Sequence, residues 1–411
     1  MELMKGYKQT ELGIIPEDWK IESVGKTNLV TSGGTPNTNI SKYWNGNIRW
    51  MNSGELNLKI VSEVQNRITS EGLKNSATKL IPKHCVLIGL AGQGKTRGTA
   101  AFNTIELCTN QSIAAIHPST YYDQKFLYYN IDKRYDELRA LSTGDGGRGG
   151  LNLSIIRNFK IPAPTNTIEQ IKIAKALSET DDYITSLEKL IEKKKAIKQG
   201  VMQELLKPTD GWETKKLGEI GKTFGGLSGK SKNDFNRGRF PFIPFMNVMS
   251  NPIIDIHFFN YVNVANGESQ NLVLKGDLIF NGSSETPEEL GMCSILLNEI
   301  PFLYLNSFCF GFRLNKETQI NGLYLSYYFR SKEGRKLFFS MAQGATRYNL
   351  SKANFNNLFI KIPSVKEQDK IAKILYDIDQ ELKTLEQKLF KAINLKLGMM
   401  QNLLTGKIRL A

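Results

Sequence analysis

The segment EQIKIAKALSETDDYITSLEKLIEKKKAIKQGVMQELL, residues 169–206, returns in altered form as EQDKIAKILYDIDQELKTLEQKLFKAINLKLGMMQNLL, residues 367–404. Every matched residue keeps one offset of 198 positions, from the first residue of the segment to the last, without a gap. An offset held over a whole segment indicates an internal duplication. We therefore expect a chain of two halves that each end in the same element.

The repeated segment has the apolar spacing of a long helix with a coiled-coil seam. Such a seam must pack on another surface. The simplest partner is the other copy, which predicts an intramolecular coiled coil, and burial of each helix in its own half is the alternative. The predicted seam residues, three and four positions apart, are Leu177, Ile184, Leu187 and Ile191 in the first copy, and Leu375, Ile378, Leu382, Leu385 and Leu389 in the second.

Both predicted helices begin with the same signal. Asn166 with Glu169, and Ser364 with Glu367, match the capping-box pattern of a helix start. At about 1.5 Å per residue, each helix would be roughly 55–60 Å long. Charged residues off the seam, such as those at 193–195, predict a solvated face, and a DNA contact there is the weaker alternative.

Composition limits the class of protein and of partner. A chain of 411 residues is too long for one ordinary core, so at least two domains are expected. Its 40% hydrophobic and 23% charged residues are typical of a soluble globular protein. A formal net charge of +14 favours a polyanionic partner, most simply nucleic acid.

Cysteine usage and hydropathy predict a cytoplasmic protein. The four cysteines show no paired spacing, and only three histidines accompany them, which predicts buried free thiols and no metal site. No run reaches the roughly 18 apolar residues of a membrane span. Residues 1–10 lack the apolar core of a signal peptide.

The repeat divides the chain into four parts. We expect a first globular domain at 1–164, a first helix at 165–206, a second globular domain at 207–363, and a second helix with a C-terminal tail at 364–411. Short apolar segments flanked by Gly, Asn or Ser predict strands in both globular domains, so an α+β architecture is expected. The scaffold kept its pattern while the globular domains diverged, which suggests two different tasks of the same kind.

One motif points to an enzyme. Residues 89–96, GLAGQGKT, match the phosphate-binding loop of nucleotide hydrolases and follow a predicted strand. A phosphate loop also requires a helix beginning at Lys95-Thr96, whose amides meet the phosphates. The residues that follow, RGTAAFNT, favour a strand or loop. A flexible loop presenting Gln93, Lys95 and Arg97 is better suited to contact DNA, and a nucleotide-binding enzyme centred on Lys95 is the alternative.

At this point the residues resemble a known family, the DNA-specificity subunits of type I restriction-modification systems. The resemblance covers almost the whole chain. It rests on IPEDW at 15–19, SGGTP at 32–36, YWNG at 43–46 and GDLIF at 276–280. It rests also on the Asn-Leu-Ser, Ile-Pro, Glu-Gln and Ile-Ala series that leads into each helix, and on LLTGKI at 403–408.

The resemblance implies a fold, a function and partners. Proteins similar to this one hold two target-recognition domains apart with two antiparallel helices, and each domain reads one half of a split, asymmetric site in double-stranded DNA. Two modification subunits with S-adenosylmethionine would dock on the scaffold, and two restriction subunits with ATP and Mg could join. The resemblance thus implies a non-catalytic, prokaryotic subunit that binds no cofactor itself.

Polar and basic residues in predicted loops are the candidates for contacting DNA. Arg and Lys suit phosphates and guanine, and Asn and Gln suit adenine. The candidates are Lys42, Tyr43, Asn45, Arg49, Gln93, Lys95, Arg97 and Arg148 in the first globular domain, and Lys230, Lys232, Asn233, Arg237, Ser283, Ser284, Arg347 and Tyr348 in the second. A solvated loop residue is the alternative for each, and a core aromatic for Tyr43. A coiled-coil assembly protein without a DNA role is a further alternative for the whole chain.

Overall fold

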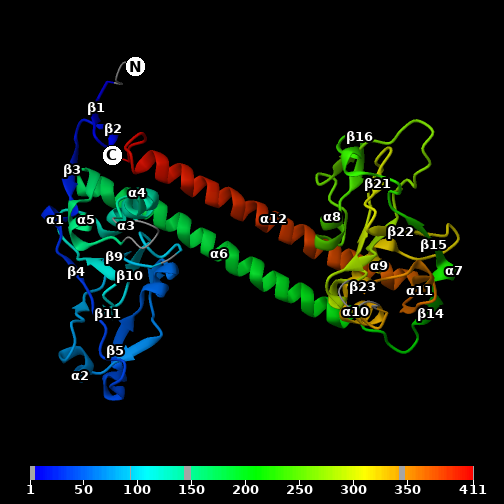
Figure 1. The fold of residues 1–411 in the computed structure, drawn as a ribbon, viewed down its shortest axis with the longest axis horizontal. Helices are drawn as coiled ribbons and strands as arrows, with labels where there is room; N and C mark the ends of the chain where they lie inside the picture. The colour runs from blue at the N-terminus through cyan, green and yellow to red at the C-terminus, as the bar shows by residue number, and fades with distance from the viewer. Residues whose placement is uncertain (1–4, 93, 143–149, 342–347, 411) are drawn as a thin grey trace. The chain divides into compact units, whose positions relative to one another are not determined.

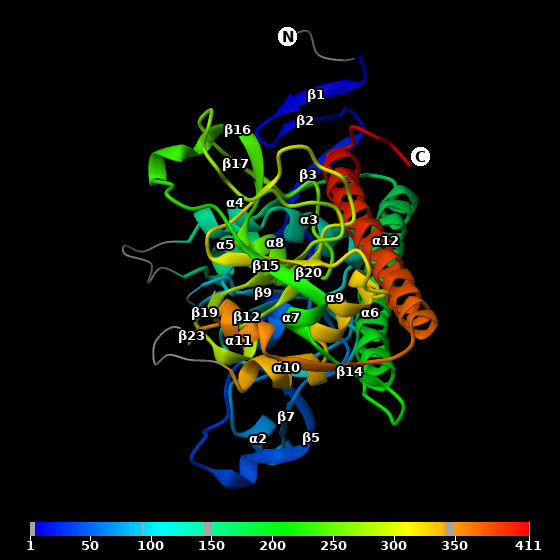
Figure 2. The ribbon, with the colours of Figure 1, turned by 90° about the vertical axis from the view of Figure 1, so that its right-hand side faces the viewer.

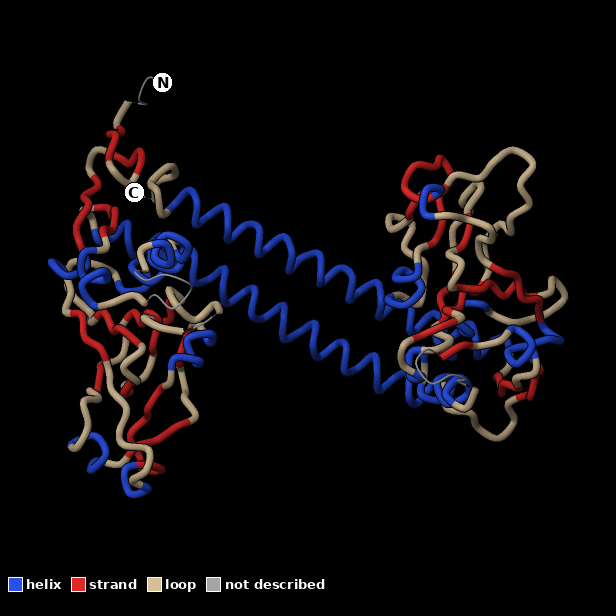
Figure 3. The backbone as a smooth tube through the Cα atoms, in the orientation of Figure 1, coloured by secondary structure: helices blue, strands red, loops and turns tan. Residues whose placement is uncertain are grey.

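A computed structural model describes residues 5–92, 94–142, 150–341 and 348–410, apart from the side chains at 236 and 237. The chain forms two compact units. The first comprises Met1–Glu188 and Gln387–Ala411, and the second comprises Lys189–Glu386. Each unit therefore contains one globular domain, the start of one long helix and the end of the other. Helices and strands are mixed in both (Figure 3).

The first unit contains the N-terminal globular domain. Its elements are β1 (Tyr7–Thr10), β2 (Gly13–Pro16), β3 (Trp19–Ser23), α1 (Val24–Thr27), β4 (Val30–Ser32), η1 (Ser41–Tyr43), β5 (Trp44–Met51), η2 (Ser53–Leu58), β6 (Ile60–Val61), β7 (Asn66–Ile68), α2 (Ser70–Lys74), β8 (Leu80–Ile81), β9 (Val86–Gly89), β10 (Ala100–Asn103), β11 (Leu107–Thr109), β12 (Ile113–Ile116), α3 (Gln124–Lys133), α4 (Tyr135–Ala140), α5 (Leu153–Asn158), β13 (Lys160–Pro164) and the first part of α6 (Thr167–Leu205).

The second unit contains the other globular domain. Its elements are β14 (Glu213–Lys216), α7 (Leu217–Ile220), β15 (Gly221–Gly225), η3 (Lys232–Asp234), β16 (Phe235–Ile243), α8 (Phe245–Ser250), β17 (Asn260–Val262), β18 (Leu278–Asn281), β19 (Ser283–Ser284), η4 (Pro287–Glu289), β20 (Cys293–Ile295), β21 (Tyr304–Leu305), β22 (Cys309–Leu314), α9 (Gly322–Arg330), α10 (Lys332–Phe339), β23 (Tyr348–Asn349), α11 (Lys352–Asn356), β24 (Phe359–Ile362) and the first part of α12 (Val365–Leu403).

The two globular domains have a similar strand order although their sequences diverge, and β6 and β8 are additional edge strands of the first domain. The first has sheets ordered β4-β12-β9-β10-β6 and β7-β5-β11-β8, and the second has β15-β22-β18-β20 and β17-β16-β21. In each, one long strand pairs antiparallel with a short strand and parallel with another: β5 with β7 and β11, and β16 with β17 and β21. An entry strand pairs antiparallel with the strand before the long helix, β3 with β13 and β14 with β24.

Two helix starts depend on single side chains. α9 and α10 are separate helices because Ser331 adopts an extended conformation and its Oγ caps α10 by accepting from the Gly334 amide at 3.3 Å. At the first long helix, Asn166 Oδ1 accepts from the Ile168 amide at 2.9 Å. The expected reciprocal capping box is absent there, since the Glu169 carboxylate binds Arg409 instead.

Each long helix has 39 residues, about 58 Å at the usual rise. Within each unit the start of one helix packs antiparallel on the end of the other. In the first unit Lys396 of α12 pairs with Asp181 of α6 at 2.6 Å, and in the second Lys198 of α6 pairs with Asp379 of α12 at 2.5 Å. Of the predicted seam residues, Leu177, Leu187, Ile191, Leu375, Leu382 and Leu385 are buried, and Ile184, Ile378 and Leu389 are half-buried.

The ends of both helices lie in the cores of the globular domains. In the first unit Leu403 and Leu404 of the α12 end join a core that includes Trp19 and Phe126. In the second unit a cluster of phenylalanines centred on Phe280 forms the equivalent core, which includes Leu375. The helices therefore belong to the globular cores as well as to each other. The described part of the chain contains no helix long and apolar enough to cross a membrane.

Candidate nucleic-acid interface

Each globular domain carries a bulged strand at the end away from the long helices (Figures 1 and 2). In the first domain η1, β5 and β7 form what we name the first arm, residues 41–68, and in the second η3, β16 and β17 form the second arm, residues 232–262. Trp44 and Ile48 of β5 both pair with Ile68. Phe235 and Phe240 of β16 both pair with Val262. The residues between each pair are therefore excluded from the ladder and form a bulge.

A glycine in each bulge approaches the partner strand closely. A Cβ added to Gly46 would lie 2.5 Å from the carbonyl oxygen of Ile68, and one added to Gly238 would lie 1.7 Å from the carbonyl carbon of Val262. Only glycine fits at such an approach. Beside Gly46, Asn45 adopts a φ of 60° in the left-handed region, which asparagine tolerates better than most residues. The bulge geometry is therefore encoded locally in both domains.

Several predicted DNA contacts gather on the first arm. Lys42 of η1 is exposed and forms an ion pair with Glu71 at 2.5 Å, and this hydrogen bond raises the pKa of Lys42. Asn45 is exposed and Tyr43 is half-buried. Arg49 of β5 is half-buried and lies 3.4 Å from the Glu63 carboxylate. These four residues share one short stretch of the first domain.

The second arm presents a similar set. Lys232 and Asn233 lie in η3 with exposed side chains. Lys230 differs, because its ammonium is 2.5 Å from Glu268 and its side chain is only 8% exposed. Hydrogen bonds from Lys230, from Gln270 and from a backbone amide lower the pKa of Glu268 to about 2. We interpret Lys230 as a residue that holds the base of the arm, and its prediction as a DNA contact stays a prediction.

Three further predicted residues are largely buried. Arg97 is 8% exposed, Ser283 is 7% exposed and Ser284 is 6% exposed, so little of each residue is open to a DNA contact, which stays a prediction. The serines lie in β19, which pairs with β23 through Tyr348, a half-buried residue. A polar side chain in a short strand cannot be distinguished from a loop residue by composition alone, which is why both serines were expected in a loop.

The structure describes only some of the remaining predicted residues. Lys95 is exposed in the loop between β9 and β10. Arg237 lies in β16, but its side chain is outside the described part of the chain. Gln93, Arg148 and Arg347 also lie outside the described residues.

The loop at Lys95 lacks the geometry of a phosphate-binding loop. No helix begins at Lys95-Thr96; the loop leads into β10, which pairs antiparallel with β9. The Lys95 carbonyl oxygen accepts hydrogen bonds from Thr99 Oγ1 at 2.6 Å and from the Tyr135 hydroxyl at 3.2 Å. A hairpin connection provides no helix N-terminus for a phosphate. The nucleotide-binding alternative therefore loses the structural feature on which it depends.

The arms also present residues that the sequence reasoning missed. Asn47 lies in the first bulge and Arg239 in the second, and both are exposed. No ion pair of Arg239 occurs among the described residues. Amide and guanidinium groups are the side chains that make paired hydrogen bonds to adenine and guanine. A glycine inside an aromatic strand pattern, as at Gly46 and Gly238, is a signal of a bulge that could have identified both residues.

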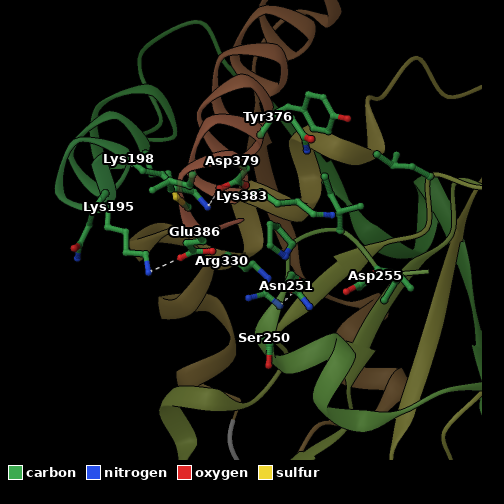
Figure 4. Close-up of a pocket in the computed structure, with 18 of the residues that line it drawn as sticks. Lys195, Lys198, Ser250, Asn251, Asp255, Arg330, Tyr376, Asp379, Lys383 and Glu386 are labelled. Carbon is green, nitrogen blue, oxygen red and sulfur yellow. Dashed lines mark hydrogen bonds and ion pairs between the residues drawn. The ribbon is translucent and has the colours of Figure 1, made fainter. Parts of the chain in front are cut away.

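A groove of about 1250 Å³ lies within the second unit, between the two helices and residues 250–257 (Figure 4). Charges of both signs line it and pair with each other, Lys195 with Glu386 at 2.8 Å and Lys198 with Asp379. In its floor, Arg330 donates to backbone carbonyl oxygens that include those of Asn251 and Cys293. Burial lowers the pKa of Arg330 to about 10. These contacts tie α8 and β20 together, which gives Arg330 a structural role.

Among the described residues, no group of three or more His, Cys, Asp or Glu side chains is placed to bind a metal ion. All four cysteines are buried and free. Burial raises the pKa of Cys85 to about 12 and that of Cys108 to about 11, which keeps both thiols protonated and unreactive.

Solved structures share this fold. An S subunit of a type I restriction-modification system from M. genitalium superposes with a TM-score of 0.60 at 18% identity, over 98% of each chain. An HsdS subunit from Thermoanaerobacter tengcongensis gives a TM-score of 0.51 at 16% identity, over 96% of this chain and 98% of that one. The fold class is thus that of two mixed α/β domains joined by a pair of long helices, as the sequence predicted.

Sequence comparison then assigns the family. The model of the type I restriction modification DNA specificity domain matches twice, at residues 16–199 and 209–395. The MjaIX specificity subunit of Methanocaldococcus jannaschii is 26% identical over 326 residues, 72% of each chain. The MjaVIII specificity subunit of the same organism is 23% identical over 415 residues, covering 96% of this chain and 94% of the relative. The chain belongs to the family of type I restriction-modification DNA-specificity subunits.

Proposed function

We propose that the chain recognises an asymmetric bipartite DNA site, with one globular domain on each half-site. The observation that carries the proposal is the pair of arms, which occupy one topological place in both domains but differ in their side chains. The first bulge presents Asn45 and Asn47, and the second presents Arg239. Asparagine suits adenine and arginine suits guanine, so the two arms would prefer different bases.

The basic charge supports DNA as the partner. A net charge of +14 attracts a polyanion, and contacts from Lys42, Lys95 and Lys232 to phosphates would position the arms without selecting a sequence. Substitution of a lysine that binds a phosphate should weaken binding at all sites and reduce its dependence on salt concentration. Substitution of a residue that binds a base should act at one position of one half-site.

The proposal extends to the partner subunits. Two modification subunits would dock on the helix pair and supply S-adenosylmethionine chemistry, and two restriction subunits with ATP and Mg could join them. This chain would then bind no cofactor and carry out no catalysis, and it would act in the prokaryotic cytoplasm. The duplicated helices support two equivalent partner positions, because each unit contains the start of one copy of the repeated helix and the end of the other.

A methylation map tests the proposal. Deleting the gene should remove one methylated motif with two unlike half-sites from the host genome, and restoring it should return the motif. Restoring it as Arg239→Ala should degrade recognition in one half-site only, at a cost of about 1–3 kcal/mol at one base pair. Lys222→Ala, an exposed position in β15 outside both arms, is the control. An unchanged map after deletion, in a host that expresses all subunits, would contradict the proposal.

A further inference from the structure

An aspartate of α6 joins three elements in the first unit. The hydroxyl of Tyr129, on α3, donates to Asp181 Oδ2 at 2.8 Å, and Lys396 of α12 lies 2.6 Å from Asp181 Oδ1. The Lys396 ammonium also lies 5.7 Å from the centre of the Tyr129 ring. We name these three residues the first clasp. It connects the globular domain, the helix that leads out of it and the helix that returns to it.

The same arrangement occurs in the second unit at an offset of 198 residues. The hydroxyl of Tyr327, on α9, donates to Asp379 Oδ2 at 2.7 Å, and Lys198 lies 2.5 Å from Asp379 Oδ1. The Lys198 ammonium is 5.7 Å from the centre of the Tyr327 ring. Figure 4 shows Lys198 and Asp379 on facing helices beside the groove. These residues form the second clasp, in domains whose sequences otherwise diverge.

The tyrosines of the clasps are buried, and the lysines are partly exposed to solvent. Tyr129 is 2% exposed and Tyr327 is fully buried, and burial is the main cause that raises the pKa of both phenols, so that they remain hydrogen-bond donors. The side chains of Lys198 and Lys396 are each 22% exposed. The side chains of Asp181 and Asp379 are 30% and 18% exposed, so both carboxylates lie at the edge of the helix interface.

Both lysines fall on the coiled-coil seam. Continuing the seam spacing of α12 beyond Leu389 reaches Ala392 and then Lys396, and the equivalent position of α6 is Lys198. A polar residue at one seam position costs stability but can specify the register. A slide of one heptad in one direction would place Lys198 opposite Glu386 and Lys396 opposite Glu188, so the lysines alone do not exclude it. The two aspartates, and the helix ends that lie in the two globular cores, oppose such a slide.

Neighbouring registers break both clasps at once. A slide of one heptad moves the facing residues by about 10 Å and puts an aliphatic side chain beside each aspartate. The residues concerned are Leu389 or Leu403 for Asp181, and Ile191 or Leu205 for Asp379. Either slide would also separate each lysine from the aspartate that it shares with the tyrosine.

We infer that the two clasps are positioning sites that select a single register of the helix pair and seat each globular domain on that register. Tyr129 and Tyr327 connect each globular domain to that register, because each tyrosine donates a hydrogen bond to the aspartate that faces the returning helix. Resting on the proposed function, this register would in turn set which spacing between the two half-sites the protein accepts. The lysine, aspartate and tyrosine would act through position and would not contact DNA.

The test follows the register directly in the full chain without DNA. Lys194 and Glu381 are an ion pair at 2.8 Å, so cysteines at these two positions should be joined by a short thiol cross-linker. Cysteines at 194 and 388 would face each other only after a slide of one heptad. In a chain with intact clasps, we expect cross-linking of Lys194→Cys/Glu381→Cys and none of Lys194→Cys/Lys388→Cys. The four native cysteines are buried, and the chain without added cysteines controls for them.

The decisive variant replaces the lysine of each clasp with leucine. Lys198→Leu/Lys396→Leu should keep or raise the melting temperature while cross-linking at 194 and 388 rises at least tenfold. Lys193→Leu/Lys391→Leu, exposed positions at the same offset of 198, should leave the register unchanged. A lower melting temperature with cross-linking still confined to 194 and 381 would assign the lysines a merely stabilising role and overturn the inference.

A charge exchange tests the inference independently if Lys198→Leu/Lys396→Leu fails to fold. Asp181→Lys/Asp379→Lys places lysine opposite lysine in both clasps, and adding Lys198→Asp/Lys396→Asp restores opposite charges. We expect the fourfold exchange to recover the native cross-link that the twofold change loses. No recovery in a folded fourfold chain would contradict a role in register. These outcomes do not involve DNA, so they can fail while bipartite recognition holds, and the reverse.

Discussion

Arg409 and Glu169 are 240 residues apart in the chain, yet the guanidinium donates to both carboxylate oxygens of Glu169, at 2.7 and 2.8 Å. Glu169 is 1% exposed, so Arg409 is the partner that compensates its burial. The same guanidinium donates to Asp18 at 2.8 and 2.7 Å, which holds the pKa of Asp18 below its usual value. The hydrogen bonds to Glu169 and to Asp18 raise the pKa of Arg409. The C-terminal segment is thereby fastened to the start of the first helix and to the first domain.

Removing Arg409 should destabilise the first unit. Arg409→Ala leaves Glu169 buried without its cation, and we expect the free energy of unfolding to fall by about 2–3 kcal/mol at pH 7. Urea unfolding measures it. The pKa of Asp18 is lower in the folded protein than in the unfolded chain. The contribution of Asp18 to the free energy of unfolding is therefore present above about pH 3.8, and it is lost as the pH falls through the pKa of Asp18 in the folded protein. Lys407→Ala, two residues away and exposed, should have little effect; an equal loss there would contradict the assignment.

Lys133 should make stability rise with pH. Burial, with Arg134 and Lys407 nearby, lowers its pKa to about 8, below the value of 10.5 in the unfolded chain. Between these values the unfolded chain binds more protons, so this residue's contribution favours the folded state increasingly from about pH 8 upward. Lys133→Gln should raise the melting temperature at pH 7 and lose this gain by pH 10. Lys125→Gln, exposed on the same helix, should show no such pH dependence.

Substituting the glycine of one bulge should affect the recognition of one half-site only. Gly46→Ala and Gly238→Ala each force a Cβ against the neighbouring strand, so one arm must shift in each variant. We expect each substitution to weaken recognition of one half-site at least tenfold and to leave the other half-site selective. Binding to duplexes mutated in either half measures this. Equal loss at both half-sites from a single substitution would argue against independent arms.

Two other glycines should respond in the opposite direction. Gly200 in α6 and Gly398 in α12 occupy equivalent positions, and nothing lies within 4 Å of a Cβ added to either. Glycine inside a helix costs about 0.5–1 kcal/mol relative to alanine. Gly200→Ala and Gly398→Ala should each stabilise the protein by that amount, measured by thermal unfolding. Destabilisation would indicate a bend that alanine cannot follow.

Features set by local sequence could be predicted. The seam spacing predicted both long helices, which form as α6 and α12. Strands were predicted in both globular domains, and they form there. These elements depend on neighbours within a few residues, so the local pattern is enough to place them.

Features set by distant contacts could not be predicted. Arg97 was expected in an exposed loop, but the β9–β10 hairpin buries it. Lys198 and Lys396 are ordinary interruptions of an apolar pattern in the sequence, and only the fold places Asp379 and Asp181 opposite them. Pairings across 180 residues or more follow from the packing of whole domains. The offset of 198 was predicted for the repeated helices, which contain the aspartates and lysines of the clasps, but not for Tyr129 and Tyr327 in the globular domains.

The repeated clasp also bears on how such proteins diversify. Each globular domain meets the helices through a tyrosine at one fixed place, while its arm lies at the opposite end. A domain of different sequence could seat on the same helices if it kept that tyrosine and the core contacts of the helix ends. A change confined to the arm would therefore leave the attachment in place, because the two lie at opposite ends of each domain.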